Sequence, residues 1–124
     1  MDGDARAAFG LRLRYSEEPP GLVATVTPGP QHRGPAGFLH GGVAALCLDE
    51  TMAALGYVLD RVRTVTATLS LRYRRPVPLD GAAVRVEAWR DRPEARRTQK
   101  VHGRLVLADG TVAVEASGLF VQAR

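Results

Sequence analysis

One segment, residues 41–59, is apolar on nearly every side, and it restricts the possible folds more than any other feature. An ordinary surface helix is apolar along one stripe only, whereas here Val, Ala, Leu, Met, Cys and Tyr surround the helix. Such a helix must be covered on most sides, so we expect a long central helix that Asp60 and Arg61 end. Asp49 and Glu50 interrupt the apolar run, and we therefore expect no membrane span.

The chain after this helix predicts only strands. Residues 64–74 alternate between Thr, Ser or Arg on one face and Val, Ala, Leu or Tyr on the other, which is the two-residue period of a strand. We expect further strands at residues 82–92, 97–107 and 111–122, with turns at 76–81 and 93–95 and a hairpin at Asp109-Gly110.

The chain before the helix is less regular. Residues 11–15 and 22–27 predict two strands that could form a hairpin across the turn at 16–21. Residues 1–10 are rich in Ala and predict a short, loosely held helix, and residues 28–37 form a loop rich in Pro and Gly. One helix and one sheet make a two-layer α+β domain, in which the sheet curls around the helix.

Length and composition fit one soluble globular domain over residues 1–124, with residues 1–20 as an N-terminal extension or hairpin strand. The chain has 124 residues, of which 45% are apolar and 24% charged. The acidic start has no secretory pattern, and a single cysteine, Cys47, can form neither an internal disulfide nor a cysteine-based metal site. We therefore expect a cytoplasmic protein without a metal or cofactor.

The net charge of +4 permits nucleic acid, an anionic membrane or a phosphorylated small molecule as a partner. No helix carries a basic stripe and no cluster of aromatic residues could stack on bases, so we expect no nucleic-acid partner. Arg72, Arg74 and Arg75 gather where a strand ends. They form either a solvated face or a site for phosphates, and the Arg96-Arg97 pair is a weaker candidate for the same role.

Two features within the helix indicate chemistry. A carboxylate in an apolar helix is costly unless it is paired or functional; we expect Glu50 to face solvent and Asp49 to have a functional role. Gly41 and Gly42 open the helix, where N–H groups lack intrahelical acceptors and where a ligand can approach a backbone without Cβ atoms. They either start the helix tightly or form an oxyanion hole, a set of donors that binds a carbonyl oxygen as it gains negative charge.

The spacing of these features predicts an oligomer. His40 and Asp49 are nine positions apart, which on a helix is about 13 Å of rise and two and a half turns. One helix therefore cannot bring the Gly41 amide and the Asp49 carboxylate to one small reacting group, whereas two antiparallel copies can. We expect an isologous dimer, or a dimer of dimers.

The sequence resembles the hotdog-fold acyl-CoA thioesterases of the phenylacetate-pathway (PaaI) and 4-hydroxybenzoyl-CoA thioesterase type. It is especially similar to mammalian members with a His-Gly-Gly…Asp-Glu-Thr helix, and the elements correspond over roughly residues 20–122. The matching segments are GPAGFLHGG at 34–42, Asp49-Glu50-Thr51, TATLSLRYRRP at 66–76 and PLDG at 78–81. The resemblance implies a long helix wrapped by a curved antiparallel sheet, a dimer with two interfacial sites, and hydrolysis of an acyl-CoA thioester.

The resemblance also implies roles for single residues. Asp49 matches the general base or nucleophile, Gly41 the amide donor to the thioester carbonyl, and His40 the histidine that shapes this turn. Thr66 falls where the family often has a hydroxyl near the attacking water. Gly42, Gly34, Arg74 and Arg75 are expected to bind the substrate, the arginines at the CoA phosphates.

One departure concerns position 34, six residues before the histidine, where many members carry Asn or Gln. Gln31 or His32 could take over that role, or the role is absent; otherwise His32 is expected to be a solvated loop residue. We expect His102 to be exposed and Cys47 to fill the core.

The predicted function is hydrolysis of an acyl-CoA to a free acid and CoA. A non-catalytic acyl-CoA-binding or sensor protein of the same fold is the alternative, and Asp49 favours the enzyme because a binder needs no carboxylate beside a carbonyl. A hydratase of this fold would need a different His-and-acid pattern, which the sequence does not contain.

Overall fold

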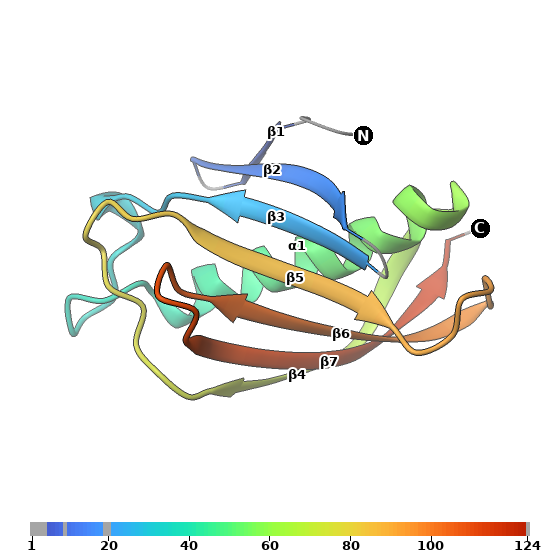
Figure 1. Cartoon of the computed structure of the whole chain (residues 1–124). Helices are drawn as coiled ribbons and strands as arrows, with labels where there is room; N and C mark the ends of the chain where they lie inside the picture. Colours follow the sequence, from blue (N-terminus) through green and yellow to red (C-terminus); the bar gives the residue numbers. More distant parts are fainter. Residues whose placement is uncertain (1–4, 9, 19–20, 124) are drawn as a thin grey trace.

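The computed structural model describes residues 5–8, 10–18 and 21–123. It contains one long helix, one short 3-10 helix and a single antiparallel sheet (Figure 1). The elements in chain order are β1 (Ala5–Ala8), β2 (Leu11–Glu18), β3 (Gly21–Val26), the 3-10 helix η1 (Pro30–His32), α1 (Gly41–Asp60), β4 (Thr64–Tyr73), β5 (Val84–Arg90), β6 (Thr98–Val106) and β7 (Val112–Gln122).

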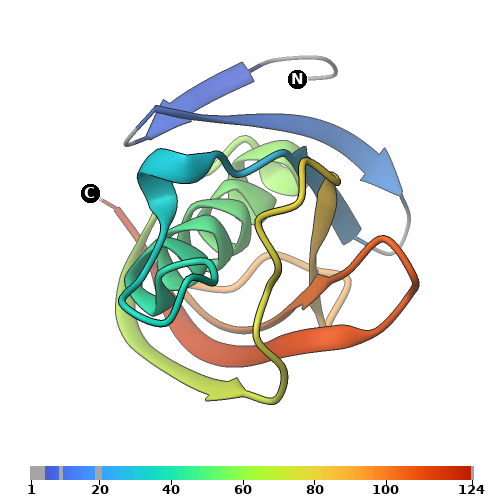
Figure 2. The ribbon, with the colours of Figure 1, turned by 90° about the vertical axis from the view of Figure 1, so that its left-hand side faces the viewer.

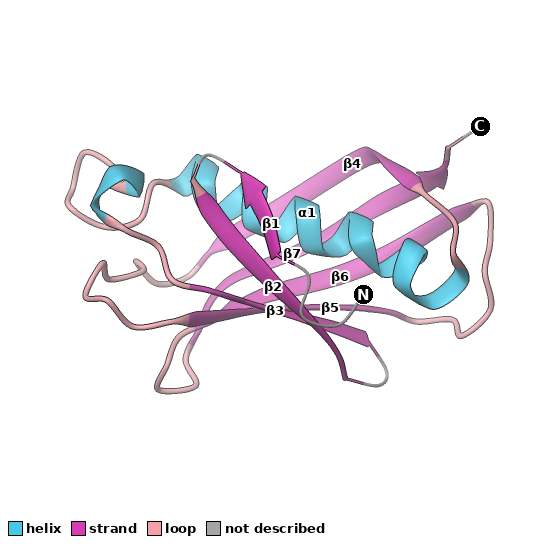
Figure 3. Ribbon diagram, turned by 90° about the horizontal axis from the view of Figure 1, so that it is seen from above, coloured by secondary structure: helices cyan, strands magenta, loops and turns pink. Residues whose placement is uncertain are grey.

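The sheet curls around the helix. Its strand order is β1-β2-β3-β5-β6-β7-β4, so β4 crosses to the far edge and pairs with β7 rather than with its successor β5. The view along the helix shows the strands wrapping around α1 (Figure 2). From above, β1 and β2 cross the direction of the helix at an angle (Figure 3).

The core lies between the helix and the concave face of the sheet. Leu48, Met52 and Leu55 of α1 are fully buried, and alternate residues of the strands face them. Gly103 of β6 allows α1 to pack closely against the sheet, because a Cβ there would lie 2.8 Å from the sulfur of Met52. The helix can therefore sit directly on the middle of the sheet.

The long helix, the N-terminal hairpin and the four later strands were all predicted, and the structure confirms them. The predicted helix over residues 1–10 is wrong for its described part, because Ala5–Ala8 forms a strand paired with β2. A short Ala-rich helix has marginal stability by itself, whereas pairing with β2 provides backbone hydrogen bonds to a strand that is already formed. Residues 1–4 and 9 lie outside the described residues.

By length and composition alone, α1 could cross a membrane. A central helix of a packed domain passes the same test, and α1 packs against β3, β4, β5, β6 and β7. The structure therefore explains the apolar character of this helix by its place in the core.

Candidate active site

His40 caps the start of α1. Its ring Nδ1 accepts a hydrogen bond from the Gly42 N–H at 2.9 Å, so one of the amides that a helix start leaves without a partner is satisfied. An accepting Nδ1 is unprotonated, so a neutral ring in this arrangement carries its proton on Nε2 and can donate from there. The preceding loop is fixed by two backbone hydrogen bonds, from Leu39 to Val77 and from His40 to His32.

Gly41 and Gly42 differ in what surrounds them. A Cβ on Gly42 would lie 3.1 Å from the His40 ring, so a side chain there would press on the cap. A Cβ on Gly41 would make only ordinary contacts of 3.6 Å with Tyr73, and its φ is not positive. The Gly41 N–H is the first amide of the helix and has no intrahelical acceptor. Gly41 thus combines a helix-start N–H, unpaired within the helix, with a Cβ side that faces the Tyr73 ring.

Asp49 and Thr66 meet on the inner side of the sheet. The Thr66 hydroxyl donates to Asp49 Oδ1 at 2.6 Å, and this joins the middle of α1 to the start of β4. The expectation that Thr66 shares a face with Thr68 and Ser70 is wrong. A bulge between Thr66 and Thr68 shifts the register, so that Thr66 lies opposite the buried Phe120. The extra residue turns Thr66 toward the helix, and such bulges often re-aim a side chain near active sites.

Tyr73 is a neighbour of the helix start that sequence reasoning did not single out. Its hydroxyl donates to the Gly41 carbonyl at 2.6 Å across 32 residues of sequence. Desolvation raises the pKa of Tyr73 above its ordinary value, so the hydroxyl keeps its proton at neutral pH. The only signal in the sequence is an aromatic residue at the end of a strand, which is equally typical of a core position.

A hollow of about 190 Å³ adjoins Gly41 and Tyr73, with Arg74 and Arg75 among its lining residues. Its other walls are mostly apolar: Leu39, Ala44, Pro76, Val77 and Val114. Arg74 Nε donates to Glu115 at 2.5 Å, whereas Arg75 makes no ion pair with the described residues. Of the two predicted phosphate-binding arginines, Arg75 is therefore the more available.

Gly34 and its neighbours are placed by backbone packing. The Gly34 N–H donates to the Phe38 carbonyl, and a Cβ on Gly34 would lie 3.2 Å from the His40 Cα. The expectation of a solvated His32 is wrong: the residue is only 3% exposed, and its Nδ1 accepts from the Gly29 N–H. The side-chain nitrogens of His32 and Gln31 both lie near Gly10.

Cys47 is a buried core residue, as expected. Burial raises the pKa of its thiol to about 11, so the group remains a neutral thiol at physiological pH. It therefore lacks the thiolate that a nucleophilic cysteine requires.

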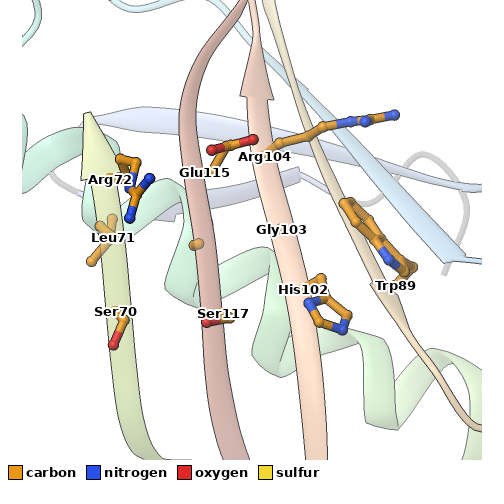
Figure 4. A pocket seen from close by; sticks show the side chains of 10 residues that line it. Ser70, Leu71, Arg72, Trp89, His102, Gly103, Arg104, Glu115 and Ser117 are labelled. Carbon is orange, nitrogen blue, oxygen red and sulfur yellow. The ribbon is translucent and has the colours of Figure 1, made fainter. Parts of the chain in front are cut away.

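A second hollow, of about 420 Å³, lies on the outer face of the sheet (Figure 4). His102 is half-buried there rather than exposed, since its ring stacks on Trp89 and its Nε2 lies 3.0 Å from Asp91. Arg104 of the same face is paired with Glu87. The polar groups of this hollow therefore mostly pair with one another, as cross-strand pairs on a solvated sheet face do. Arg96, a weaker candidate, pairs with Glu94 at 3.5 Å.

The described contacts thus form two groups along one helix. Gly41, His40 and Tyr73 meet at its start, and Asp49 meets Thr66 at its middle. No described contact joins the two groups within the chain.

Comparison with known proteins decides the family, since the model of the Thioesterase superfamily matches residues 36–114. The chain belongs to the Thioesterase superfamily. The matched region includes both groups of site residues.

Acyl-coenzyme A thioesterase THEM4 of Xenopus laevis is 31% identical over 130 residues, which cover 98% of this chain and 54% of that protein. Acyl-coenzyme A thioesterase THEM4 of Bos taurus is 33% identical over 76% of this chain and 38% of its own length. The chain spans about half the length of the relatives it matches, or less.

Solved structures of the superfamily have the same fold. A thioesterase superfamily protein of known crystal structure is 32% identical, with a TM-score of 0.76 over 92% of this chain and 54% of that one. The E. coli PaaI protein from the phenylacetic acid degradation operon has a TM-score of 0.78 at 17% identity, over 94% of this chain and 81% of its own. The predicted hotdog fold, a long helix wrapped by an antiparallel sheet, is thereby confirmed.

Proposed function

We propose that this chain hydrolyses the thioester bond of an acyl-CoA and releases a free acid and CoA. The observation that carries the proposal is the hydrogen bond from Thr66 to Asp49, which sets a carboxylate of the largely apolar helix α1 beside a hydroxyl of β4. The names of the THEM4 relatives support the choice of substrate. A Streptococcus mutans protein of the same fold, with a TM-score of 0.80 at 16% identity, is bound to acetyl-CoA.

The proposed chemistry begins with a water molecule held by this pair. The Thr66 proton is already donated to Asp49, so the lone pairs of its hydroxyl face outward and can accept from water. The carboxylate takes the second proton of that water as its oxygen attacks the thioester carbonyl carbon. The tetrahedral intermediate then collapses, the C–S bond breaks, and the CoA sulfur receives the proton that Asp49 took.

The Gly41 amide is the proposed donor to the carbonyl oxygen. As the first N–H of the helix it lies at the positive end of the helix dipole, where negative charge on the intermediate is stabilised. The hollow of about 190 Å³ that Gly41 lines gives the thioester access to this amide. Because Gly41 and Asp49 belong to separate groups in one chain, we propose that each site takes Gly41 from one subunit and Asp49 from another.

Arg75, with Arg74 beside it, is proposed to bind the phosphates of CoA at the mouth of the hollow next to Gly41. Arginine suits phosphate because its planar guanidinium can donate two parallel hydrogen bonds. Arg74 would have to give up its pairing with Glu115 to contribute fully.

The test is a CoA-release assay over short, medium, long and aromatic acyl-CoAs, with Asp49→Asn compared with wild type. Asn keeps the shape and the acceptor for Thr66 but takes up no proton, so kcat should fall about 10²- to 10⁴-fold at an unchanged melting temperature. Glu50→Gln, one position along the same helix, is the matched control and should retain its activity. Binding of acyl-CoA without hydrolysis by the wild type would refute the enzyme and favour a binding protein. Full activity of Asp49→Asn would refute the mechanism.

A further inference from the structure

Tyr73 has no part in the mechanism above, yet its hydroxyl reaches the first residue of the helix at 2.6 Å. The side chain is 53% exposed, so its place is not explained by core packing. Its ring atoms lie 3.6 Å from the position of a Cβ on Gly41, so the ring covers one side of that glycine. A half-exposed tyrosine therefore touches the residue whose amide is the proposed donor to the substrate.

The peptide group between Gly41 and Gly42 is held at both ends. Its carbonyl accepts from the Tyr73 hydroxyl, and its N–H donates to Nδ1 of His40. Two successive glycines have the greatest backbone freedom of any dipeptide, and a helix start that contains them tends to fray. The two side chains fix this peptide, which directly follows the Gly41 N–H, and so limit the rotation of the residue that carries the proposed oxyanion donor.

We propose that Tyr73 is a positioning residue, which holds the Gly41 amide in the orientation that the reaction requires. This inference rests on the proposed function. It assigns Tyr73 no contact with the substrate; the residue acts through the Gly41 backbone. Since an oxyanion donor is used fully only when charge develops on the carbonyl oxygen, loss of its alignment should lower kcat and leave KM nearly unchanged.

The experiment removes one oxygen atom. Tyr73→Phe keeps the ring against Gly41 and deletes the hydroxyl, and we expect kcat to fall about 10-fold, a part of the 10²- to 10³-fold that loss of a whole donor costs. KM should stay within about twofold, as for any contact used only in the transition state. Tyr57→Phe is the matched control. The Tyr57 ring lies near the end of α1, beside Arg61 and Arg63 of the following loop and away from the helix start, so kcat should not change.

A second readout does not depend on turnover. In protein labelled with ¹⁵N-glycine, the Gly42 amide should exchange its hydrogen faster in Tyr73→Phe than in wild type, because the peptide is then held at one end only. The effect on kcat should also shrink when Tyr73→Phe is added to Gly41→Ala, since both changes alter the same contact between residues 41 and 73.

Several results would overturn the inference: an unchanged kcat, a rise in KM alone, full additivity with Gly41→Ala, or unaltered exchange at Gly42. A wild-type protein that hydrolyses no acyl-CoA would instead refute the proposed function. If the wild type is active and Tyr73→Phe has the same kcat, only the role of Tyr73 is refuted.

Discussion

Gly41 and Gly42 stand next to each other, but the chain needs them for different reasons. Gly42 leaves room for the His40 ring that caps it, because a Cβ would come within 3.1 Å of that ring. Nothing in its own chain demands glycine at position 41, where a Cβ would have ordinary contacts. A helical glycine is less stable than alanine by about 1 kcal/mol. Packing within the chain therefore does not explain glycine at position 41, which lines the hollow beside Tyr73.

The two glycines can be separated by experiment. Gly41→Ala should leave the melting temperature unchanged or raise it, because alanine favours a helix, while kcat falls at least 10-fold because the methyl group narrows the hollow between Gly41 and Tyr73. Gly42→Ala should lower the melting temperature, because it disturbs a cap that is worth about 1 kcal/mol. Thermal unfolding and acyl-CoA hydrolysis of both variants would check this, and an active Gly41→Ala enzyme would contradict it.

Single residues show where sequence reasoning succeeded and where it failed. Asp49 could be singled out because a carboxylate is conspicuous on an apolar helix. The face of Thr66 was predicted wrongly because a strict two-residue period cannot contain a bulge, and neither Ala67 nor its neighbours signal one. His32 and Tyr73 were missed because their partners, Gly29 and Gly41, are backbone atoms fixed only by the folded loops.

At the scale of elements, the end of the helix is tied to the sheet by a buried cluster. Arg90, the last residue of β5, has a side chain only 4% exposed and donates to both oxygens of Asp60, at 2.5 and 3.0 Å. It also donates to the Gln99 side chain of β6 and to the Pro93 carbonyl of the connecting loop. One guanidinium thus joins α1, β5, β6 and a loop.

Removal of this guanidinium should be far more damaging than removal of an exposed one. Arg90→Met removes a buried guanidinium and leaves the partly exposed Asp60 carboxylate without its partner, and we expect a loss of about 3 kcal/mol in the free energy of unfolding. Arg96→Ala removes an exposed pair with Glu94 and should cost at most about 1 kcal/mol. Urea unfolding at one fixed protein concentration measures the stability of both variants. Equal unfolding midpoints for Arg90→Met and Arg96→Ala would contradict a special stabilising role of the cluster.

The elements themselves were largely predictable, but their neighbours in the sheet were not. Alternating polar and apolar residues identify each strand, because one face of the sheet is buried and the other is exposed. The alternation does not show which other strand pairs with it. The long connection from β4 to β5 carries the chain across the domain, so that β5 pairs with β3 and β4 with β7. That order depends on how the whole sheet closes around α1, a global property that no local pattern contains.

At the scale of the molecule, β4 is an edge that a single chain leaves open. It spans ten residues and pairs only with β7 among the described strands. Arg72 and the bulge between Thr66 and Thr68 protect part of this edge, but it contains neither Lys nor Pro, and Val65 is 56% exposed on it. Such an edge is expected to be covered, and a second copy that pairs antiparallel with it would extend the sheet through a two-fold axis. The same axis could bring the helices together as antiparallel neighbours.

A site shared between subunits makes a sharp prediction. Gly41→Ala and Asp49→Asn chains should each be nearly inactive alone, yet a mixture unfolded and refolded together should regain activity. In a mixed dimer, one site receives the intact Gly41 of one chain and the intact Asp49 of the other, while the second site receives both changes. Random pairing of equal amounts makes half of the dimers mixed, so about a quarter of the wild-type activity should return. Sedimentation velocity should show the dimer throughout. If both residues of a site came from one chain, every site in the mixture would carry a change, and refolding together would restore nothing.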